Sequence, residues 1–208
     1  MIIFHEGLPR SGKSYEAVRY RIIAALEKGR EVVAYIEGLN FEKIAPLAKI
    51  SVERCRELLH PLTREDMAEV LKHVRDNALH VFDEAQNFWG NRDKLSKEMT
   101  QFVTEHGHRG MDIVLMGQDR RDVNALWRRR IEIVQAFVKL SGLGSDKSYS
   151  VTTWKHQGGE VYIKVGTQVH RYDPKFFGTY ASHTGEDIQT CWRRPKINPL
   201  TAIVPIQI

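Results

Sequence analysis

Eight residues near the start of the chain constrain its fold more than any other stretch. Residues 7–14 read Gly-Leu-Pro-Arg-Ser-Gly-Lys-Ser, which matches the pattern G-x-x-x-x-G-K-[ST] in full. They follow an apolar run, Met1–Glu6, and they open a segment with the apolar spacing of a helix, Lys13–Lys28. A strand, a glycine-rich loop and a helix in that order predict a phosphate-binding loop in an α/β fold.

The residue types in this loop suit a bound triphosphate. Gly7 and Gly12 allow backbone conformations that turn successive N–H groups toward phosphate oxygens. Lys13 can reach the β- and γ-phosphates, and the Ser14 hydroxyl can bind Mg²⁺. We therefore predict a nucleotide site formed by Gly7, Leu8, Pro9, Arg10, Ser11, Gly12, Lys13, Ser14 and Tyr15.

Two acidic residues stand at the end of a second apolar run. Residues 79–84 read Leu-His-Val-Phe-Asp-Glu, so that Asp83 and Glu84 would end a buried strand. Asp83 is predicted to hold the Mg²⁺ shell through water, with Ser14 as the other metal-binding residue, and Glu84 to polarise a water aimed at the γ-phosphate. A lone Asp-Glu pair is usually a solvated turn, and it is its place behind an apolar strand that favours the catalytic interpretation.

A third apolar run, residues 112–116, leads to Gln118. An amide at the tip of this predicted strand can sense a γ-phosphate, although an ordinary strand-end amide is the alternative. Arg109 lies shortly before the same run and is predicted to donate charge to a phosphate, either in its own subunit or across a subunit boundary. The predicted catalytic residues are thus Glu84, Lys13, Gln118 and Arg109.

Other arginines compete with Arg109 for this role. The candidate arginine fingers are Arg109, Arg128, Arg129 and Arg130, with Arg120 and Arg121 as further rivals. Each is also a candidate for an ordinary surface or partner contact. The neighbouring His106 and His108 lack further ligands close by in the sequence, so we expect no zinc site there.

Several nucleotide-binding classes are disfavoured by missing motifs. The chain has no N-K-x-D stretch for guanine and no D-x-x-G switch placed after a strand, which disfavours a GTPase. Glu84 directly after the metal-binding Asp83 favours hydrolysis over transfer to a small molecule. We therefore expect a Mg²⁺-dependent ATPase, with ATP and Mg²⁺ as its ligands.

Composition and charge place the chain among soluble globular proteins with a basic contact surface. Hydrophobic residues make up 42% and charged residues 27%, which argues against disorder, collagen and coiled coil. Residues 1–119 hold 17 basic and 19 acidic side chains, whereas residues 120–208 hold 14 and 7. The basic part can meet nucleic acid, anionic lipid or an acidic protein, or it can be a solvated face. The sequence shows neither a signal peptide nor a membrane span.

Strand-like and helix-like segments alternate through the first part of the chain, which predicts a parallel sheet covered on both faces. Residues 40–61 are expected to be irregular because of Pro46 and Pro61. Thr63 and Asp66 predict a capping box at the start of a helix. Beyond these, we expect strands at 1–6, 31–36, 78–83, 112–116 and 131–140, helices at 13–28, 93–106 and 122–130, and a hairpin at 149–165 around Gly158 and Gly159.

Several of these motifs together resemble one known family. Gly7–Ser14 is followed by Tyr15-Glu16-Ala17-Val18, and the match continues through Ile36-Glu37-Gly38-Leu39, Asp83-Glu84-Ala85-Gln86, His108-Arg109-Gly110-Met111-Asp112-Ile113, Gln118, Arg128–Arg130 and Lys139. Over residues 1–140 the chain resembles the zonula occludens toxin (Zot)-like proteins, relatives of the gene I assembly ATPase of filamentous phages. Two positions depart from the usual pattern. Arg10 replaces a small residue, and Gly117 stands where a hydroxyl residue is common.

This resemblance implies a fold and a domain organisation. The fold would be a P-loop NTPase of the additional-strand, RecA/FtsK-like class, a three-layer αβα sandwich with a mainly parallel sheet and a C-terminal antiparallel β appendage. We expect an ATPase core at residues 1–140, a β-hairpin-rich appendage packed on it at 141–194, and a tail at 195–208. The tail would lead toward a transmembrane segment absent from this chain, with Arg193, Arg194 and Lys196 on its cytoplasmic flank.

The resemblance also implies a cellular role. Such a chain would be the cytoplasmic ATPase domain of a bacterial inner-membrane protein that extrudes filamentous phage. Its partners would be further copies in a homo-oligomeric ring, a phage DNA–protein complex, and coat or other assembly proteins, with the membrane reached through the absent region. Two alternatives stay open. They are a DNA-translocating or packaging ATPase of the FtsK/HerA-like class, and a nucleotide-gated adaptor with negligible turnover.

Overall fold

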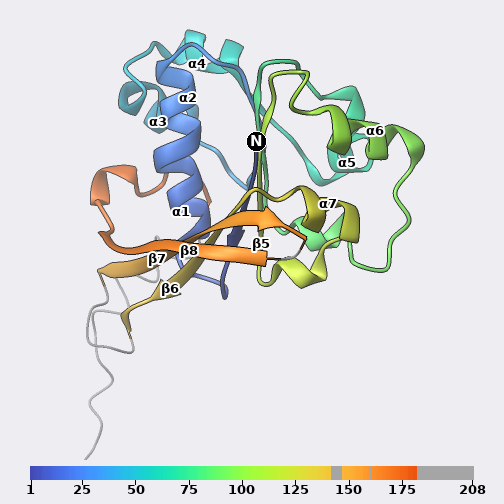
Figure 1. Cartoon of the computed structure of the whole chain (residues 1–208). Coiled ribbons are helices and arrows are strands. Elements are labelled where there is room, and N and C mark those ends of the chain that lie inside the picture. Colours follow the sequence, from blue (N-terminus) through green and yellow to red (C-terminus); the bar gives the residue numbers. More distant parts are fainter. Residues whose placement is uncertain (142–146, 160, 182–208) are drawn as a thin grey trace, which may run out of the picture.

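The computed structural model describes residues 1–141, 147–159 and 161–181 (Figure 1). The described residues form an eight-stranded sheet in the order β3-β2-β4-β5-β1-β6-β7-β8. Its strands are β1 (Ile2–Glu6), β2 (Val32–Tyr35), β3 (Leu59–Pro61), β4 (Leu79–Phe82), β5 (Asp112–Gly117), β6 (Ile133–Lys139), β7 (Ser148–Gly158) and β8 (Val161–Arg171).

Strand β1, which precedes the glycine-rich loop, lies between β5 and β6 and runs parallel to both. Strand β5 separates β1 from β4, the strand that precedes the acidic pair. This is the additional strand that the sequence resemblance implied. Because all these strands are parallel, their carboxyl ends meet at one edge of the sheet, and loops at that edge can share a ligand.

The last two strands continue the same sheet as an antiparallel hairpin. Strand β6 pairs in parallel with β1 and in antiparallel with β7, which then pairs with β8. The buried Tyr149 and Val151 of β7 join the apolar cluster around the first helix. The hairpin is therefore joined to the parallel core through β6 and packs against the helix that follows the loop. The predicted boundary at residue 140 stays a prediction.

One helical layer covers the sheet on the side of that first helix. α1 (Lys13–Ala17), a π-helical turn (Val18–Ile22) and α2 (Ile23–Glu27) form a continuous helix. It ends at Gly29, whose φ of 71° is the left-handed conformation that stops a helix. The predicted helix at 13–28 is confirmed.

The expectation that residues 40–61 are irregular is wrong. They form α3 (Phe41–Leu47), α4 (Val52–Leu58) and β3. Asn40 and Ser51 cap the two helices by accepting hydrogen bonds from the backbone N–H groups of Lys43 and Arg54. Pro46 costs α3 a single backbone donor late in a short helix, and Pro61 lies on an edge strand, where a missing N–H is tolerated.

A second helical layer covers the opposite face of the sheet. It contains α5 (Arg64–Ala68), a 3₁₀ turn (Val70–Lys72), α6 (Lys97–Glu105) and α7 (Ala125–Arg130). The predicted capping box at Thr63 and Asp66 is present. Helix α6 begins four residues later than predicted, after the cap Ser96, because Asp93 instead accepts a hydrogen bond from the Gly90 N–H at 2.6 Å.

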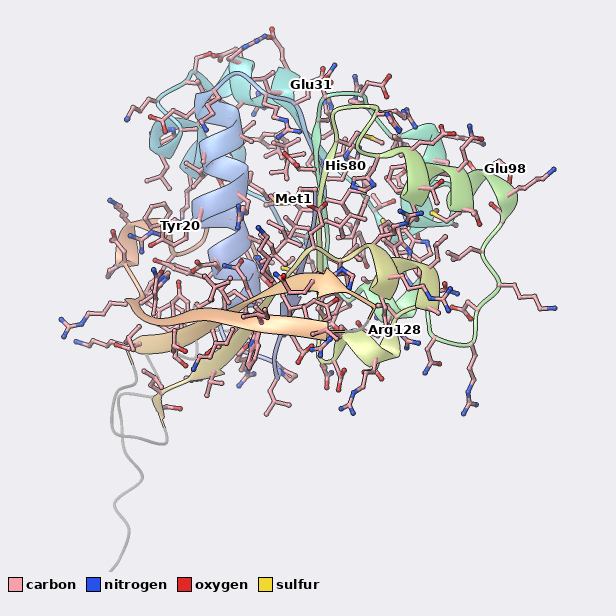
Figure 2. All side chains as sticks on the ribbon, in the orientation of Figure 1. Met1, Tyr20, Glu31, His80, Glu98 and Arg128 are labelled. Carbon is pink, nitrogen blue, oxygen red and sulfur yellow. The ribbon has the colours of Figure 1, made fainter. Side chains whose placement is uncertain are left out.

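The sheet separates two apolar clusters. The cluster on the α1 side gathers Val18, Ile22 and Val114, and the cluster on the α6 side gathers Phe4, Phe102 and Trp127. His80 of β4 is fully buried in this second layer, with its ring 6.1 Å from that of Phe102 (Figure 2). These two packed layers confirm the three-layer αβα sandwich. No helix in the described ranges is long and apolar enough to cross a membrane.

Candidate nucleotide-binding site

The loop at residues 7–14 begins where β1 ends and passes into α1. Gly12 has a φ of 105°, and a Cβ there would lie 3.0 Å from the Tyr172 hydroxyl and 3.2 Å from the Tyr149 ring. A Cβ on Gly7 would lie 2.6 Å from the carbonyl oxygen of Phe137 in β6. Only glycine suits these positions, because no side chain fits between the loop and the strands beside it.

Lys13 is folded back onto the loop. Its Nζ donates hydrogen bonds to the carbonyl oxygens of Gly7 at 2.7 Å and Leu8 at 3.1 Å, and the residue is 5% exposed. Burial lowers the pKa of Lys13, an effect that the nearby carboxylates of Asp83 and Glu84 oppose. The ammonium group thus lies inside the loop and within the field of both acidic residues, where a phosphate can replace the carbonyl partners.

Ser14 and Asp83 meet across the loop. The Ser14 hydroxyl donates to the Asp83 Oδ2 at 2.9 Å, and burial raises the pKa of the Asp83 carboxyl. Mg²⁺ takes oxygen ligands and usually keeps several of its waters. The hydroxyl and the carboxylate are therefore donors of the right type for the predicted metal position, and they lie close enough to share one hydrated Mg²⁺.

Glu84 turns sharply away from the end of β4. Its φ of 47° is left-handed, which is uncommon for a side chain larger than glycine and recurs at functional sites. Its N–H donates to the Asp83 Oδ1 at 2.9 Å, and its carboxylate accepts a hydrogen bond from the Gln86 side chain. The two predicted acidic residues are thus held side by side at the carboxyl edge of the sheet, with different partners.

Gln118 follows β5 at the same edge and is exposed. The Gly7 N–H donates to the Gly117 carbonyl at 3.2 Å, so the end of β5 is joined to the loop. A Cβ on Gly117 would lie 2.8 Å from the Gln86 Oε1. The Gln86 amide therefore occupies the space that a hydroxyl side chain at 117 would need. This accounts for one of the two departures from the family pattern.

Arg109 lies at the opposite edge of the sheet from the loop. It precedes the first residue of β5, its backbone carbonyl accepts from the Asn77 N–H, and its Nε lies 2.6 Å from the Asp76 Oδ1. Six residues of strand, each rising about 3.3 Å, separate it from the phosphate-binding edge. The prediction that Arg109 contacts a phosphate in its own subunit is therefore wrong. A contact across a subunit boundary stays a prediction.

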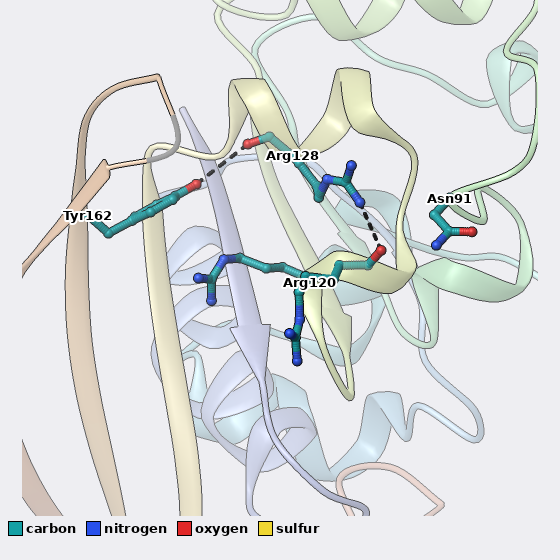
Figure 3. A pocket seen from close by; sticks show the side chains of 5 residues that line it. Asn91, Arg120, Arg128 and Tyr162 are labelled. Carbon is teal, nitrogen blue, oxygen red and sulfur yellow. Dashed lines mark hydrogen bonds between the residues drawn. The ribbon is translucent and has the colours of Figure 1, made fainter.

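The remaining arginine candidates divide between the two edges. Arg130 acts electrostatically on the buried His106 and so lies on the amino-edge side, whereas Arg128 turns toward Arg121 and donates to its carbonyl at 2.9 Å. Arg129 is exposed at the end of α7. A cavity of about 380 Å³ is lined by Asn91, Arg120, Arg121, Arg128 and Tyr162 (Figure 3).

Two of the arginines in this cavity are already paired with carboxylates. Arg120 Nη1 lies 2.9 Å from the Glu6 Oε2, and Glu6 directly precedes the phosphate-binding loop. Arg121 forms a forked pair with Asp119. Arg128 has no ion-pair partner among the described residues, so its guanidinium is the one in this cavity best able to take a phosphate from outside.

The side chain of Tyr15 belongs to the core and not to the nucleotide site. It is 3% exposed, and its ring lies 5.1 Å from that of Tyr172 and 5.9 Å from that of Tyr149. Behind it, Glu16 accepts a hydrogen bond from the Tyr149 hydroxyl and lies 3.2 Å from the His170 Nδ1. Sequence reasoning missed this buried polar group, because Tyr149 and His170 lie more than 130 residues from Glu16 in the chain.

Comparison with known proteins agrees with this geometry. The family model described as "Zonular occludens toxin (Zot)" matches residues 1–186. The Gene 1 protein of Xanthomonas phage phiLf is 33% identical over 193 residues, which cover 86% of this chain and 44% of that protein. This chain belongs to the Zot family.

Other similarities extend the same picture. The zona occludens toxin of Vibrio cholerae is 25% identical over 88% of this chain and 52% of its own length. This chain thus spans about half the length of the curated relatives it matches. The N-terminal domain of zonular occludens toxin from Neisseria meningitidis has a TM-score of 0.58, with 20% identity, over 86% of this chain and 98% of that one.

A genome packaging NTPase shares the fold. The structure of B204 from Sulfolobus turreted icosahedral virus 2 in complex with AMPPCP has a TM-score of 0.55, with 11% identity, over 82% of this chain and 96% of that one. The predicted P-loop NTPase fold, with its antiparallel C-terminal strands, is therefore confirmed.

Proposed function

We propose that this chain is the ATP-binding and ATP-hydrolysing cytoplasmic domain of an inner-membrane protein that assembles and extrudes filamentous phage. The observation that carries the proposal is the meeting of Lys13, Ser14, Asp83 and Glu84 at the carboxyl edge of the sheet. The family match and the relative named Gene 1 protein of a phage support the assembly role.

Each of these residues has a chemical task in the proposed reaction. Backbone N–H groups of the loop bind phosphate oxygens, and Lys13 exchanges its carbonyl partners for the β- and γ-phosphates. Ser14 and Asp83 would hold Mg²⁺, which would supply positive charge to the transferring phosphoryl group when bound. Glu84 accepts the proton of the attacking water, and Gln118 contacts the γ-phosphate from the end of β5.

We further propose that the active form is a ring in which an arginine crosses the subunit boundary. Lys13 and the metal supply only part of the positive charge that the γ-phosphate needs, and Arg109 lies at the wrong edge of its own subunit. Arg128 is the best candidate, because it lines the cavity and, unlike Arg120 and Arg121 there, it pairs with no described carboxylate. An arginine finger contributes roughly 10³–10⁵ in rate, so an isolated subunit would be a weak ATPase. Tethering to a membrane through a region outside this chain would raise the local concentration.

The similarity to a genome packaging NTPase favours one second candidate. In it, the same site would drive movement of bare DNA instead of extrusion of a DNA–protein complex with coat and other assembly proteins. Stimulation of ATP turnover by single-stranded DNA alone would support this candidate. Stimulation only by the phage DNA–protein complex would support the assembly function.

The proposed function is tested by Mg²⁺-dependent ATP turnover of the wild-type chain and of Glu84→Gln. We expect Glu84→Gln to retain nucleotide affinity and to lose roughly 10²–10⁴-fold in kcat, the usual effect of a lost general base. If the chain binds ATP but shows no turnover that Glu84→Gln lowers, the proposal that it hydrolyses ATP is refuted. The nucleotide-gated adaptor would then be the remaining function.

Mixing two inactive variants tests the shared site. Lys13→Ala lacks a competent phosphate-binding loop, and Arg128→Ala lacks the proposed arginine finger. In a mixed ring, some subunit interfaces therefore pair an intact loop with an intact Arg128. Partial recovery of turnover in the mixture, at raised protein concentration, is the expected result. Arg109→Ala is the matched comparison, and we expect it to keep wild-type turnover by itself. Recovery with Arg109→Ala and none with Arg128→Ala would show that the wrong arginine was chosen.

A further inference from the structure

Gln86 is a polar side chain of the site that the proposed reaction leaves without a task. It lies in the 3₁₀ turn Ala85–Asn87, two residues after Glu84. Its Nε2 donates a hydrogen bond to the Glu84 Oε2. Its Oε1 is buried and has no hydrogen-bond partner among the described residues. Buried polar atoms without a partner are uncommon in folded proteins, and each calls for an explanation.

The end of the sensor strand is shaped around this amide. A Cβ on Gly117 would lie 2.8 Å from the Gln86 Oε1 and 3.0 Å from the Phe4 ring. The Gly117 carbonyl accepts a hydrogen bond from the Gly7 N–H at 3.2 Å. A continuous series of contacts thus runs from the phosphate-binding loop through Gly117 and Gln86 to the carboxylate of Glu84.

The carboxylate at the end of this series needs a partner to hold its position. Glu84 has three rotatable side-chain bonds and leaves β4 in a left-handed turn, so its backbone alone does not aim the carboxylate. Among the described residues, no other side chain donates a hydrogen bond to it. A general base misplaced by about 1 Å can lose roughly 10²-fold in rate.

We propose that Gln86 is a positioning residue that holds the Glu84 carboxylate toward the attacking water and couples it to the phosphate-binding loop through Gly117. The Gln86 amide takes part in the reaction through its hydrogen bond to the Glu84 carboxylate. This inference rests on the proposed function, in which Glu84 activates the water. It also explains why residue 117 is a glycine, since any side chain there would displace the amide.

The test first compares steady-state ATP turnover of the full chain with that of two single variants. Gln86→Met keeps the length of the side chain and removes its N–H donor. Gly117→Ala leaves Gln86 in place but pushes its amide with a new Cβ. We expect each to lower kcat by about 10–100-fold, while the KM for ATP and the affinity for a fluorescent non-hydrolysable ATP analogue stay within about twofold of wild type.

The double variant Gln86→Ala/Gly117→Ala tests whether the two positions act together. If Gly117→Ala acts only by displacing the amide, it has no further effect once that amide is gone, and the double variant matches Gln86→Ala. Gly107→Ala is the matched control, because a Cβ there meets nothing within 4 Å. We expect this control to keep wild-type turnover.

Two results on kcat would overturn the inference. They are wild-type kcat in Gln86→Met, and independent, multiplying losses from Gly117→Ala and Gln86→Ala. If Glu84→Gln lowers ATP turnover but Gln86→Met does not, this inference alone is refuted. If the wild-type chain shows no ATP turnover that Glu84→Gln lowers, the proposed function itself is refuted. A rise in the KM for ATP with unchanged kcat would also overturn it, since that result would assign Gln86 to nucleotide binding.

Discussion

His5 is a titratable side chain enclosed at the centre of the sheet, and its burial predicts a loss of stability in mild acid. It lies on β1, it is 0% exposed, and neither ring nitrogen has a hydrogen-bond partner in the described part of the chain. Burial lowers the pKa of His5 to about 3, with a smaller contribution from the positive charge of Arg21. The imidazole is therefore neutral in the folded protein at pH values well above 3.

The direction and size of the effect follow from proton linkage. In the unfolded chain a histidine has a pKa of about 6.5. Below that pH the unfolded state therefore binds a proton at this residue and the folded state does not. The free energy of unfolding is unaffected by this histidine above about pH 6.5. It decreases as the pH falls from about 6.5 toward 3. At pH 5 the loss is about 2 kcal/mol, from 1.5 pH units at about 1.4 kcal/mol each.

Urea unfolding followed by circular dichroism at pH 8 and pH 5 measures this loss. We expect His5→Leu to lose about 2 kcal/mol less than the wild-type chain between the two pH values, because leucine binds no proton. His108→Asn is the matched control, since His108 is exposed, and it should lose as much as the wild type. An equal loss in His5→Leu and wild type would refute the assignment of His5 as a neutral buried group.

Three other changes probe the loop and its surroundings. Lys13→Ala should abolish ATP binding in a nucleotide titration and leave the circular dichroism spectrum unchanged, because its Nζ contacts only loop carbonyls. Asp83→Asn should weaken Mg²⁺-dependent nucleotide binding yet keep or raise the free energy of unfolding at pH 8, because burial disfavours the charged carboxylate, whose pKa is raised. Tyr149→Phe should lower the free energy of unfolding by about 1.5–3 kcal/mol in urea, because the buried Glu16 carboxylate loses its hydroxyl donor. Unchanged binding, unchanged Mg²⁺ dependence and unchanged stability, respectively, would contradict these expectations.

Much of the carboxyl edge of the sheet, where the loop and the acidic pair meet, could be predicted from the sequence. Each part of this edge depends on residues that are neighbours in the chain. The spacing in residues 7–14 requires a loop between a strand and a helix, and the apolar run before Asp83 requires a buried strand. In a parallel sheet the ends of such strands meet at one edge. The observed bond between Ser14 and Asp83, which lie 69 residues apart, follows from those two facts together.

Predictions from local sequence patterns were wrong where the local structure depends on helix caps or on strands that are distant in the sequence. Residues 40–61 contain two prolines, and their influence was overestimated because Asn40 and Ser51 supply caps that stabilise short helices. The sequence predicts that Arg109 contacts a phosphate in its own subunit or across a subunit boundary, and the direction of β5, which places Arg109 at the far edge, excludes only the first of these. A strand direction is a property of the whole sheet.

The sequence by itself determined the phosphate-binding loop, the acidic pair and the alternation of strands and helices, because each depends on residues that are neighbours in the chain. Only the tertiary structure decided that the Gln86 amide fills the space at Gly117, that Tyr149 covers Gly12, and that Arg128 faces a cavity. These contacts depend on the order and register in which separate strands come together. Spacing along the chain does not reveal that order, since loop closure constrains distant segments only weakly.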